Sequence, residues 1–456
     1  MRVEGIGWFS YCLLMPIIDP VTSDIALPKK AAVTVIGGGI AGVATALELA
    51  ERGVDVALFE KGEIAAEQSS RNWGWCRQMG RDPREIPLIL ESLDLWRGMN
   101  RRINADTGFV QSGIVYLCET DAELAAKEKW YAENAKPYGL GTRMVSGEEA
   151  ASLMPGSARQ WKGALYTSAD GRAEPFKATA AMASAARRKG AKIFTNCAAR
   201  GLETSAGQVS AVVTEKGSIA CDTVVLAGGA WSRRFCHNEG IELPQLGVIS
   251  SAMRTEPIET GITRNGSGGG FGIRKRSDGG FTIAHRHLAV ADIVPDSFRL
   301  FFSFLPALVL DWKGIKLRLG KRFIDEARLA RRWKLDEVSP FEHVRILDPE
   351  PVNSILEEAA ASLKEYFPAF QSMKIAERWA GVIDAMPDAV PVMSPVEKLK
   401  GFFLATGFSG HGFGLGPGAG KLMAQLVTGE TPCVDPSPFR YSRYFDGSNP
   451  RPTTGF

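Results

Sequence analysis

The sequence predicts an α/β protein with a parallel-sheet domain and a second α+β domain built on an antiparallel sheet. Residues 33–52 pass from a β-branched run through a glycine-rich turn into a helix-forming segment. Two later strands, within 220–235 and 400–414, also end in glycines. Residues 272–287 read as a β-hairpin with Asp278-Gly279 at its turn.

Length and composition limit the class of protein. The 456 residues are enough for roughly two to three domain-sized units. A formal net charge of +3 is too small to indicate a nucleic-acid partner. The seven cysteines are odd in number and scattered, and none forms a C-x-x-C pair. We therefore expect no disulfide framework and no metal site, in a reducing cytoplasmic compartment.

Residues 1–30 are expected to be an extension that precedes the two domains. Ile6–Ile18 is apolar and uncharged, but its length of about 13 residues is short of the roughly 20 needed to cross a membrane. It is also a poor signal peptide, because no small-residue cleavage site follows closely. Two interpretations stay open: an anchor that touches a membrane, or an extension upstream of a true start at Met15.

A second apolar run, Phe298–Lys334, is also strongly basic, with ten Lys or Arg residues and three acids. One interpretation is peripheral membrane contact, in which apolar side chains enter the acyl boundary and cations meet anionic headgroups. The other is a helical insertion whose apolar face packs on its own domain. The cations of the first interpretation are Lys313, Lys316, Arg318, Lys321 and Arg322.

Gly37, Gly39 and Gly42 stand in G-x-G-x-x-G register between a buried strand, Val33–Ile36, and a helix, Ala44–Arg52. The first glycine permits a tight turn, and the second lets the backbone approach a pyrophosphate. The third lets the helix pack on the strand. The motif in this setting predicts a dinucleotide site.

The second strand of this unit, Val54–Glu60, ends on an acid. Glu60 follows Gly42 by 18 residues, where a carboxylate can accept hydrogen bonds from the ribose hydroxyls of a dinucleotide. The acid therefore strengthens the prediction that the glycine motif makes on its own.

The two later glycine-ended strands indicate which dinucleotide is bound. Ala220–Phe235 reads as a buried strand ending in Ala-Gly-Gly-Ala, typical of a turn that passes close to a cofactor. Lys400–Gly429 reads as a strand, a glycine-rich loop and a helix starting near Pro417. A helix start presents free N–H groups and partial positive charge, which would stabilise the negative charge of a reduced flavin.

These three segments resemble the D-amino-acid-oxidase-like family of FAD-dependent oxidoreductases, which includes glycine oxidase, sarcosine oxidase and bacterial amino-acid dehydrogenases and deaminases. The resemblance covers most of the chain. It implies a Rossmann-like FAD-binding domain of the GR2 type from about 31–110, 160–240 and 372–440. It also implies a substrate domain from 111–159 and 241–371, with an apolar and basic insertion at about 290–345.

The resemblance also implies the cofactor contacts. A Ser/Arg-Asn type motif, matched here by residues 69–72, crosses the pyrophosphate and reaches the flavin ring. His411 lies in the loop beside that ring, and it is the one catalytic candidate, with flavin-edge contact favoured over general-base catalysis. The expected cofactor-binding residues are Gly37, Gly39, Ile40, Ala41, Gly42, Glu60, Lys61, Ser69, Ser70, Arg71, Asn72, Ala198, Ala227, Gly228, Trp231, Gly407, Ser409, Gly410, His411, Gly412, Phe413 and Gly414.

The activity that the resemblance implies is oxidation of the C–N bond of an amino acid or N-substituted amino acid to an imine, by hydride transfer to flavin N5. Sarcosine-oxidase-like members link FAD through a cysteine in the stretch that here reads VIDAMPD. Because this stretch has no cysteine, we expect non-covalent FAD. The electron acceptor, oxygen or a respiratory quinone, stays open. If the insertion touches a membrane, we expect the inner face of the cytoplasmic membrane.

Substrate recognition departs from the family pattern. Glycine-oxidase-like members carry W-x-G-x-R-P-x-T-x-D, whose Arg grips the substrate carboxylate, but here Ile383 and Asp384 replace Arg-Pro. Either another Arg binds the carboxylate, or the substrate has none, or Asp384 meets a cationic group. The candidates for substrate binding are Trp75, Arg77, Gln78, Arg274, Arg286 and Asp384.

Two alternative functions remain open at this point. One is a secondary-amine or polyamine oxidase or demethylase, which the missing Arg favours. The other is a flavin-binding subunit of a multi-chain dehydrogenase.

Overall fold

The computed structural model describes residues 16–453, so the apolar segment Ile6–Ile18 lies almost wholly outside them. A six-stranded sheet forms the first domain, in the order β20-β21-β12-β1-β2-β8, and β20 alone runs antiparallel to its neighbour. Its strands are buried along their lengths, as parallel strands with both faces covered require. They are β1 (Val33–Ile36), β2 (Val56–Phe59), β8 (Lys192–Phe194), β12 (Val224–Leu226), β20 (Val392–Pro395) and β21 (Phe402–Thr406).

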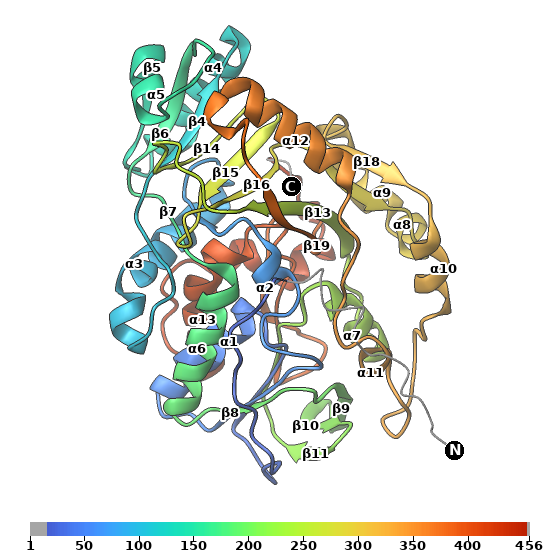
Figure 1. The fold of residues 1–456 in the computed structure, drawn as a ribbon. Coiled ribbons are helices and arrows are strands. Elements are labelled where there is room, and N and C mark those ends of the chain that lie inside the picture. Colours follow the sequence, from blue (N-terminus) through green and yellow to red (C-terminus); the bar gives the residue numbers. More distant parts are fainter. Residues whose placement is uncertain (1–15, 454–456) are drawn as a thin grey trace, which may run out of the picture.

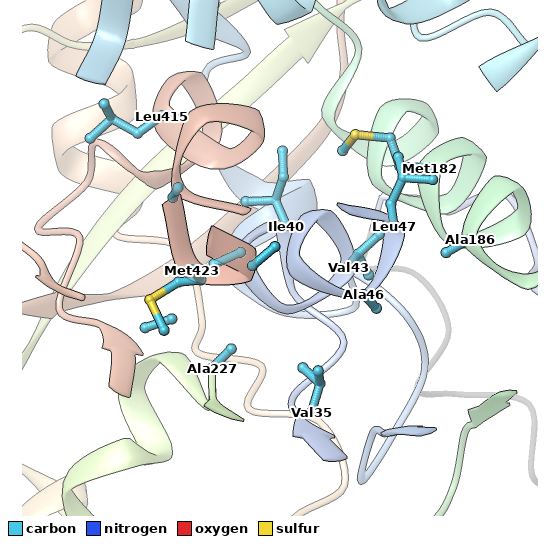
Figure 2. Packing of buried hydrophobic residues seen from close by; sticks show 14 of the residues in the cluster. Val35, Ile40, Val43, Ala46, Leu47, Met182, Ala186, Ala227, Leu415 and Met423 are labelled. Carbon is cyan, nitrogen blue, oxygen red and sulfur yellow. The ribbon is translucent and has the colours of Figure 1, made fainter. Parts of the chain in front are cut away.

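Four helices pack together on one face of this sheet (Figure 1): α1 (Ile40–Glu51), α3 (Ile86–Ile103), α6 (Pro175–Arg188) and α13 (Gly412–Thr428). Figure 2 shows Ile40, Val43 and Leu47 of α1 in the same buried cluster as Met182 of α6 and Met423 of α13. On the opposite face, aromatic and aliphatic side chains of a three-stranded sheet and two short helices complete the core. Those elements are β9 (Ala199–Ser205), β10 (Gln208–Thr214), β11 (Gly217–Ala220), α7 (Ser232–Asn238) and α11 (Pro340–His343).

Helix α13 begins at Gly412, earlier than the predicted start near Pro417. Side chains of α3 explain why the proline lies within the helix. Ser92 Oγ donates to the Gly414 carbonyl at 2.7 Å and accepts from Gly418 N at 3.1 Å, and Trp96 Nε1 donates to the same carbonyl at 3.0 Å. These bonds replace helical ones near the proline, so the first turns of α13 stay formed.

The second sheet has ten strands, in the order β18-β17-β13-β16-β15-β14-β4-β6-β5, with β19 paired to β13. β15 and β16 form the predicted hairpin. These sheets confirm the predicted α/β class with a second sheet that is antiparallel except where β14 pairs with β4 and β17 pairs with β18. The strands are β4 (Ile114–Cys118), β5 (Thr142–Ser146), β6 (Gly163–Thr167), β13 (Leu246–Thr255), β14 (Asn265–Gly268), β15 (Phe271–Lys275), β16 (Phe281–His285), β17 (Ala289–Asp292), β18 (Ile315–Arg318) and β19 (Ile375–Ala385).

Two strands fall outside the domain segments in which we expected them. β6 and β19 lie in the segments expected for the cofactor domain, but both belong to the antiparallel sheet. β6 pairs with β4 and β5, and β19 pairs with nearly the whole of β13. The boundaries near residues 160 and 372 therefore need correction. Helix α12 (Asn353–Tyr366) covers one face of this sheet (Figure 1).

The insertion lies along one side of the molecule (Figure 1) and consists of α8 (Pro295–Arg299), α9 (Phe301–Leu310), β18 and α10 (Lys321–Arg328). An ion pair between Asp296 Oδ2 and Arg233 Nε of α7, at 2.7 Å, fastens it to the first domain. Ala307 is the only buried residue of α9. The apolar face of α9 therefore packs on its own domain only in part. Phe304 packs against Val248, Ile383 and Ala385, whereas Phe301, Phe302 and Leu310 are exposed. Within residues 16–453, no helix has the length and apolar character needed to cross a membrane.

Candidate active site

A pocket opens at the carboxyl ends of β1, β2 and β12, the edge at which open parallel sheets bind ligands. We call it the dinucleotide pocket. Its walls contain eight of the predicted cofactor residues, together with Asp384. The eight are Gly37, Gly39, Glu60, Lys61, Ser69, Ala227, Gly228 and Trp231.

The three motif glycines have the spatial roles that a dinucleotide requires. A Cβ at Gly37 would lie 2.3 Å from the Ala227 carbonyl oxygen, and one at Gly42 would lie 2.1 Å from the Gly37 carbonyl oxygen. A Cβ at Gly39 would meet only Ser69 Oγ, at 3.2 Å. The space before Gly39 is therefore open, at the start of a helix with no side-chain cap and no acid in its first turn. FAD fits here, since a helix N-terminus of this kind suits a pyrophosphate.

Side chains around this helix start are held by short contacts. Ser69 Oγ accepts a hydrogen bond from Ile40 N at 2.8 Å. The Glu60 carboxylate accepts hydrogen bonds from Gly38 N and Gly62 N, both at 2.7 Å, and burial raises its pKa. The carboxylate is thus fixed at the end of β2, where a ribose is expected.

Lys61 and Trp231 mark the outer end of the dinucleotide pocket. The Lys61 amino group lies 4.5 Å from the centroid of the Trp231 ring and 2.6 Å from Glu67 Oε1. Glu67 also accepts a hydrogen bond from Trp231 Nε1 at 3.1 Å. The Trp231 ring is therefore held in place as a flat wall, the kind of surface on which a purine base stacks.

Two predicted cofactor residues, Arg71 and Asn72, line the second cavity described below, and their side chains are engaged within the chain. The buried Arg71 guanidinium donates to the carbonyls of Ala66 at 3.0 Å and Ala380 at 2.9 Å, and pairs with Asp348. Asn72 caps α2 (Gln68–Arg71), because its Nδ2 donates to Ser69 O at 2.9 Å. Nine other expected residues line neither this pocket nor the second cavity described below. They are Ile40, Ala41, Gly42, Ser70, Ala198, Gly407, Gly412, Phe413 and Gly414.

A second cavity lies between the antiparallel sheet and the loop before α13, and it shares Gln68 with the dinucleotide pocket. We call it the aromatic–cationic cavity, after its tryptophans and cations. The expected residues Ser409, Gly410 and His411 line it, as does Ile383. Its aromatic residues are Trp73, Trp75, Tyr116 and Trp130, and its Arg and Lys residues are Arg71, Arg77, Arg81, Lys127 and Arg286.

The short strand β3 (Trp75–Cys76) explains which residues of its segment reach this cavity. It pairs with β7 (Gly171–Arg172), so neighbouring side chains point to opposite sides. Trp73, Trp75 and Arg77 line the cavity, whereas Gln78 is buried elsewhere and its N–H donates to Asp170 Oδ1 at 2.8 Å. The structure therefore does not bring Gln78 to the cavity.

Arg286 follows β16 and points into the cavity. The turn is held by His285 Nδ1, which accepts from Leu288 N at 3.0 Å. Arg286 Nη1 is buried and has no hydrogen-bond partner among residues 16–453, and it lies 3.6 Å from Glu123 Oε1. A guanidinium nitrogen placed in this way has a donor available for an anionic ligand.

His411, the residue before α13, is buried beside two charged groups that the sequence analysis missed. Its Nδ1 lies 2.9 Å from Oε2 of the fully buried Glu85, and Arg81 Nη1 lies 3.7 Å from the same oxygen. Burial lowers the pKa of His411, which the charge of Glu85 opposes. Burial also lowers the pKa of Arg81, to about 10. Burial thus favours the neutral form of the imidazole, whose Nδ1 lies against a buried carboxylate.

Two predicted substrate residues lie elsewhere and need correction. Arg274 Nη1, in β15 of the second sheet, pairs with Glu174 Oε1 at the start of α6 at 2.8 Å, outside the cavity walls. Asp384 Oδ2 accepts from Gly407 N at 2.7 Å and Phe408 N at 3.3 Å, and burial raises its pKa to about 6. Asp384 therefore holds the glycine-rich loop from the dinucleotide pocket and does not face the aromatic–cationic cavity.

Comparisons with known proteins agree with this site. The family model described as FAD dependent oxidoreductase (DAO) matches residues 32–426. The L-amino acid deaminase from Proteus myxofaciens, solved with anthranilate, is 35% identical, with 95% of this chain and 97% of that chain covered and a TM-score of 0.89. The L-amino acid deaminase from Proteus vulgaris is also 35% identical, with 93% and 99% covered and a TM-score of 0.88.

A curated relative supports the same assignment. The glycine oxidase of Pseudomonas aeruginosa is 27% identical over 417 residues, which covers 89% of this chain and 97% of the relative. The family match, the likeness in fold and the fit of the dinucleotide pocket to FAD lead to one conclusion. The chain belongs to the DAO family of FAD-dependent oxidoreductases.

Proposed function

We propose that the protein oxidises the C–N bond of an α-amino acid or N-substituted α-amino acid to an imine, by hydride transfer to flavin N5. The observation that carries this proposal is Arg286, whose buried Nη1 lacks a hydrogen-bond partner among residues 16–453 in a cavity next to the dinucleotide pocket. A guanidinium suits planar carboxylate binding, and here it would replace the Arg that Ile383 does not supply.

Each part of the chain then has a defined task. FAD, when bound, supplies the hydride acceptor. The N-terminus of α1 binds the pyrophosphate, and Glu60 binds the ribose. Arg286 orients the substrate through its carboxylate, while Trp73 and Trp75 form an apolar wall that excludes water. His411 contacts the flavin edge as a neutral imidazole, and FAD is held without a covalent bond.

The alternative substrates fit the cavity less well. A cationic polyamine would enter a cavity lined by five positive side chains, Arg71, Arg77, Arg81, Lys127 and Arg286. A secondary amine without a carboxylate would leave Arg286 buried and unpaired, which is costly. The anthranilate bound to the Proteus myxofaciens relative is itself a carboxylate.

Anaerobic flavin reduction tests the proposal. Purified holoenzyme is mixed with D- and L-amino acids, N-methyl amino acids and amines, and loss of the yellow absorbance is followed. We expect amino acids to bleach the flavin and amines without a carboxylate to leave it oxidised. Bleaching by amines alone would contradict the proposal. No bleaching by any of these compounds would favour a subunit that needs partner chains.

An Arg286→Ala variant tests the carboxylate contact. We expect it to keep its flavin but to need about tenfold to a hundredfold more amino acid for half-maximal reduction, because a charge-assisted hydrogen bond is lost. Arg159→Ala is the matched control, since Arg159 is exposed and pairs with Glu365 outside the cavity. If both variants needed the same amino-acid concentration for half-maximal reduction, Arg286 would not bind the substrate carboxylate.

We further propose that the insertion rests on the inner face of the cytoplasmic membrane and that a respiratory quinone accepts the electrons. Phe302 and Trp312 are 85% and 66% exposed. Exposed Lys313 and Lys316 lie close by in the chain. Apolar side chains flanked by cations are typical of surfaces that lie on anionic membranes. Wild type is expected to sediment with anionic vesicles, and a Phe302→Ser/Trp312→Ser variant is expected to stay in solution. Failure of wild type to bind the vesicles in low salt would contradict this proposal.

A further inference from the structure

Two cations lie over the ring of Tyr116 in the aromatic–cationic cavity, and a third lines the cavity nearby. Lys127 Nζ lies 5.1 Å from the ring centroid, and the Arg286 guanidinium carbon lies 5.9 Å from it. Arg77 lines the same cavity, and its Nη1 and the edge of the Tyr116 ring both lie next to Gly80. The cations come from three separate places: helix α4 (Asp121–Trp130), the end of β16 and the segment after β3.

Few acids balance these cations. Within residues 16–453, Glu123 is the one carboxylate within 4.0 Å of Lys127, Arg77 or Arg286, at 3.6 Å from Arg286 Nη1. Glu123 is also occupied at the start of α4, since its Oε2 accepts from Thr120 N at 3.3 Å in a capping box. Three cations less one acid leave two positive charges in this part of the cavity.

The other acids nearby do not change this balance. Asp170 accepts from Gln78 N and Met79 N, and burial raises its pKa to about 7, so it carries only part of a charge. Asp311 lines the cavity from the insertion, but its carboxylate lies more than 4.0 Å from the charged nitrogens of Lys127, Arg77 and Arg286. The pKa of Lys127 is lowered to about 8 by burial and then by the charges of Arg286 and Arg77. Lys127 is therefore still mostly protonated at neutral pH, without a counter-ion.

We propose that the substrate is an amino acid with a second carboxylate, whose α-carboxylate binds Arg286 and whose side-chain carboxylate binds Lys127 beside Arg77. This inference rests on the proposed function, because it concerns the same cavity. Hydride transfer needs the amine in its neutral form, so a bound dicarboxylic amino acid brings two negative charges. That number equals the positive charge left over around Tyr116.

The two cations differ in a way that suits the two carboxylates. Arg286 offers a planar fork for a carboxylate that must be held in one orientation beside the flavin. Lys127 offers a compact charge on a flexible stem, which can follow side-chain carboxylates at different distances. An apolar amino acid would instead bury Lys127 without a counter-ion, and a basic one would be repelled.

Matched pairs of amino acids test the inference in purified holoenzyme. Flavin reduction is measured anaerobically with both enantiomers of glutamate and glutamine, which have the same shape but differ in charge. Aspartate, asparagine and leucine complete the panel. We expect glutamate or aspartate to reduce the flavin at least tenfold more efficiently than its amide, and the difference to shrink as salt rises.

Binding of non-oxidisable acids supplies a readout that needs no turnover. Glutarate is titrated against butyrate while the shift of the flavin absorbance is followed. Lys127→Gln should weaken glutarate binding at least tenfold and leave butyrate binding unchanged, and Lys127→Arg should restore most of the loss. Lys129→Gln, on the same helix but exposed and placed outside the cavity, is the control and should change neither.

The outcomes separate this inference from the proposed function. Equal flavin reduction by glutamate, glutamine and leucine would overturn the inference that the substrate has a second carboxylate. It would leave the proposed amino-acid oxidation intact. A Lys127→Gln variant that binds glutarate as tightly as wild type also overturns it. Failure of every amino acid to reduce the flavin overturns the proposed function itself. The glutamate and glutamine comparison uses wild type alone, so the test does not depend on a variant that folds.

Discussion

The two cavities that share Gln68 are built from different materials. Backbone and glycines of consecutive residues at the ends of β1 and β2 form much of the dinucleotide pocket. The aromatic–cationic cavity is formed by side chains from β3, α4, β16, β19 and the loop before α13. Where backbone atoms form a pocket, an added side chain displaces the backbone itself. A substitution there is therefore expected to weaken folding and cofactor binding together. A cavity made of side chains can change its charge while the sheet around it stays intact.

The largest effect is expected where α1 packs most closely on the glycine turn beside the dinucleotide pocket. In Gly42→Val the new Cβ would lie 2.1 Å from the Gly37 carbonyl oxygen, so α1 has to move away from β1. We expect the variant to lose more than about 4 kcal/mol of stability and to be purified without flavin. Flavin absorbance and thermal unfolding measure the two effects.

A glycine outside the pocket is the control for this variant. Gly98 lies in α3, and a Cβ there would meet no atom within 4 Å. Gly98→Ala should therefore raise stability by about 0.5–1 kcal/mol and leave the flavin in place. A yellow, stable Gly42→Val protein would show that the packing of α1 on β1 is not what holds the cofactor.

The next effect concerns a charge pair outside both cavities. Arg274→Met leaves Glu174 buried without its partner, and breaking such a pair costs about 3–5 kcal/mol. Urea unfolding should show this loss, and the double variant Arg274→Met/Glu174→Met should recover most of it. Substrate binding by the folded fraction should be unchanged. If the Arg274→Met variant had normal stability but bound substrate more weakly, Arg274 would be a substrate-binding residue of the aromatic–cationic cavity.

The difference between a pocket formed by neighbouring residues and a cavity formed by distant side chains also explains what the sequence could predict. The glycines and Glu60 act through positions close together in the chain, so their spacing was enough to place the dinucleotide pocket. Lys127, Arg286 and Arg77 meet only through the pairing of distant strands and the approach of α4, which no local pattern encodes. One local signal was available: the alternation of Trp73, Trp75 and Arg77, which turns Gln78 away from the cavity.

A pH effect distinguishes the loop-holding role of Asp384 from a role in substrate binding. Burial raises its pKa to about 6, so between about pH 4 and pH 6 the folded protein holds a proton that the unfolded chain has lost. Stability should therefore fall by roughly 3 kcal/mol as pH rises through that window and stay constant above it. Asp384→Asn should lack this fall when thermal unfolding is followed from pH 4 to 7. Parallel curves for the two proteins would contradict the buried position of this carboxylate.

The smallest effect is expected at Glu85, which acts on the substrate only through His411. Glu85→Gln keeps the shape of the side chain and one acceptor for Nδ1 but removes the charge. We expect flavin reduction to slow about fivefold to tenfold, since the carboxylate charge 2.9 Å from Nδ1 is lost. The charge of Glu85 supports the pKa of His411 against burial, so that pKa should fall further in the variant.

A purely structural Glu85 would change stability without changing the titration of His411. NMR of the imidazole nitrogens, together with the pH profile of flavin reduction, separates the two cases. Glu91→Gln on α3 is the matched control, because Glu91 Oε1 pairs with Lys421 Nζ of α13 at 2.6 Å away from the cavity. If Glu85→Gln leaves both the imidazole titration and the pH profile unchanged, His411 is oriented by its loop alone. The Glu85 carboxylate would then have only a structural role in the first domain, and it would not influence flavin reduction through His411.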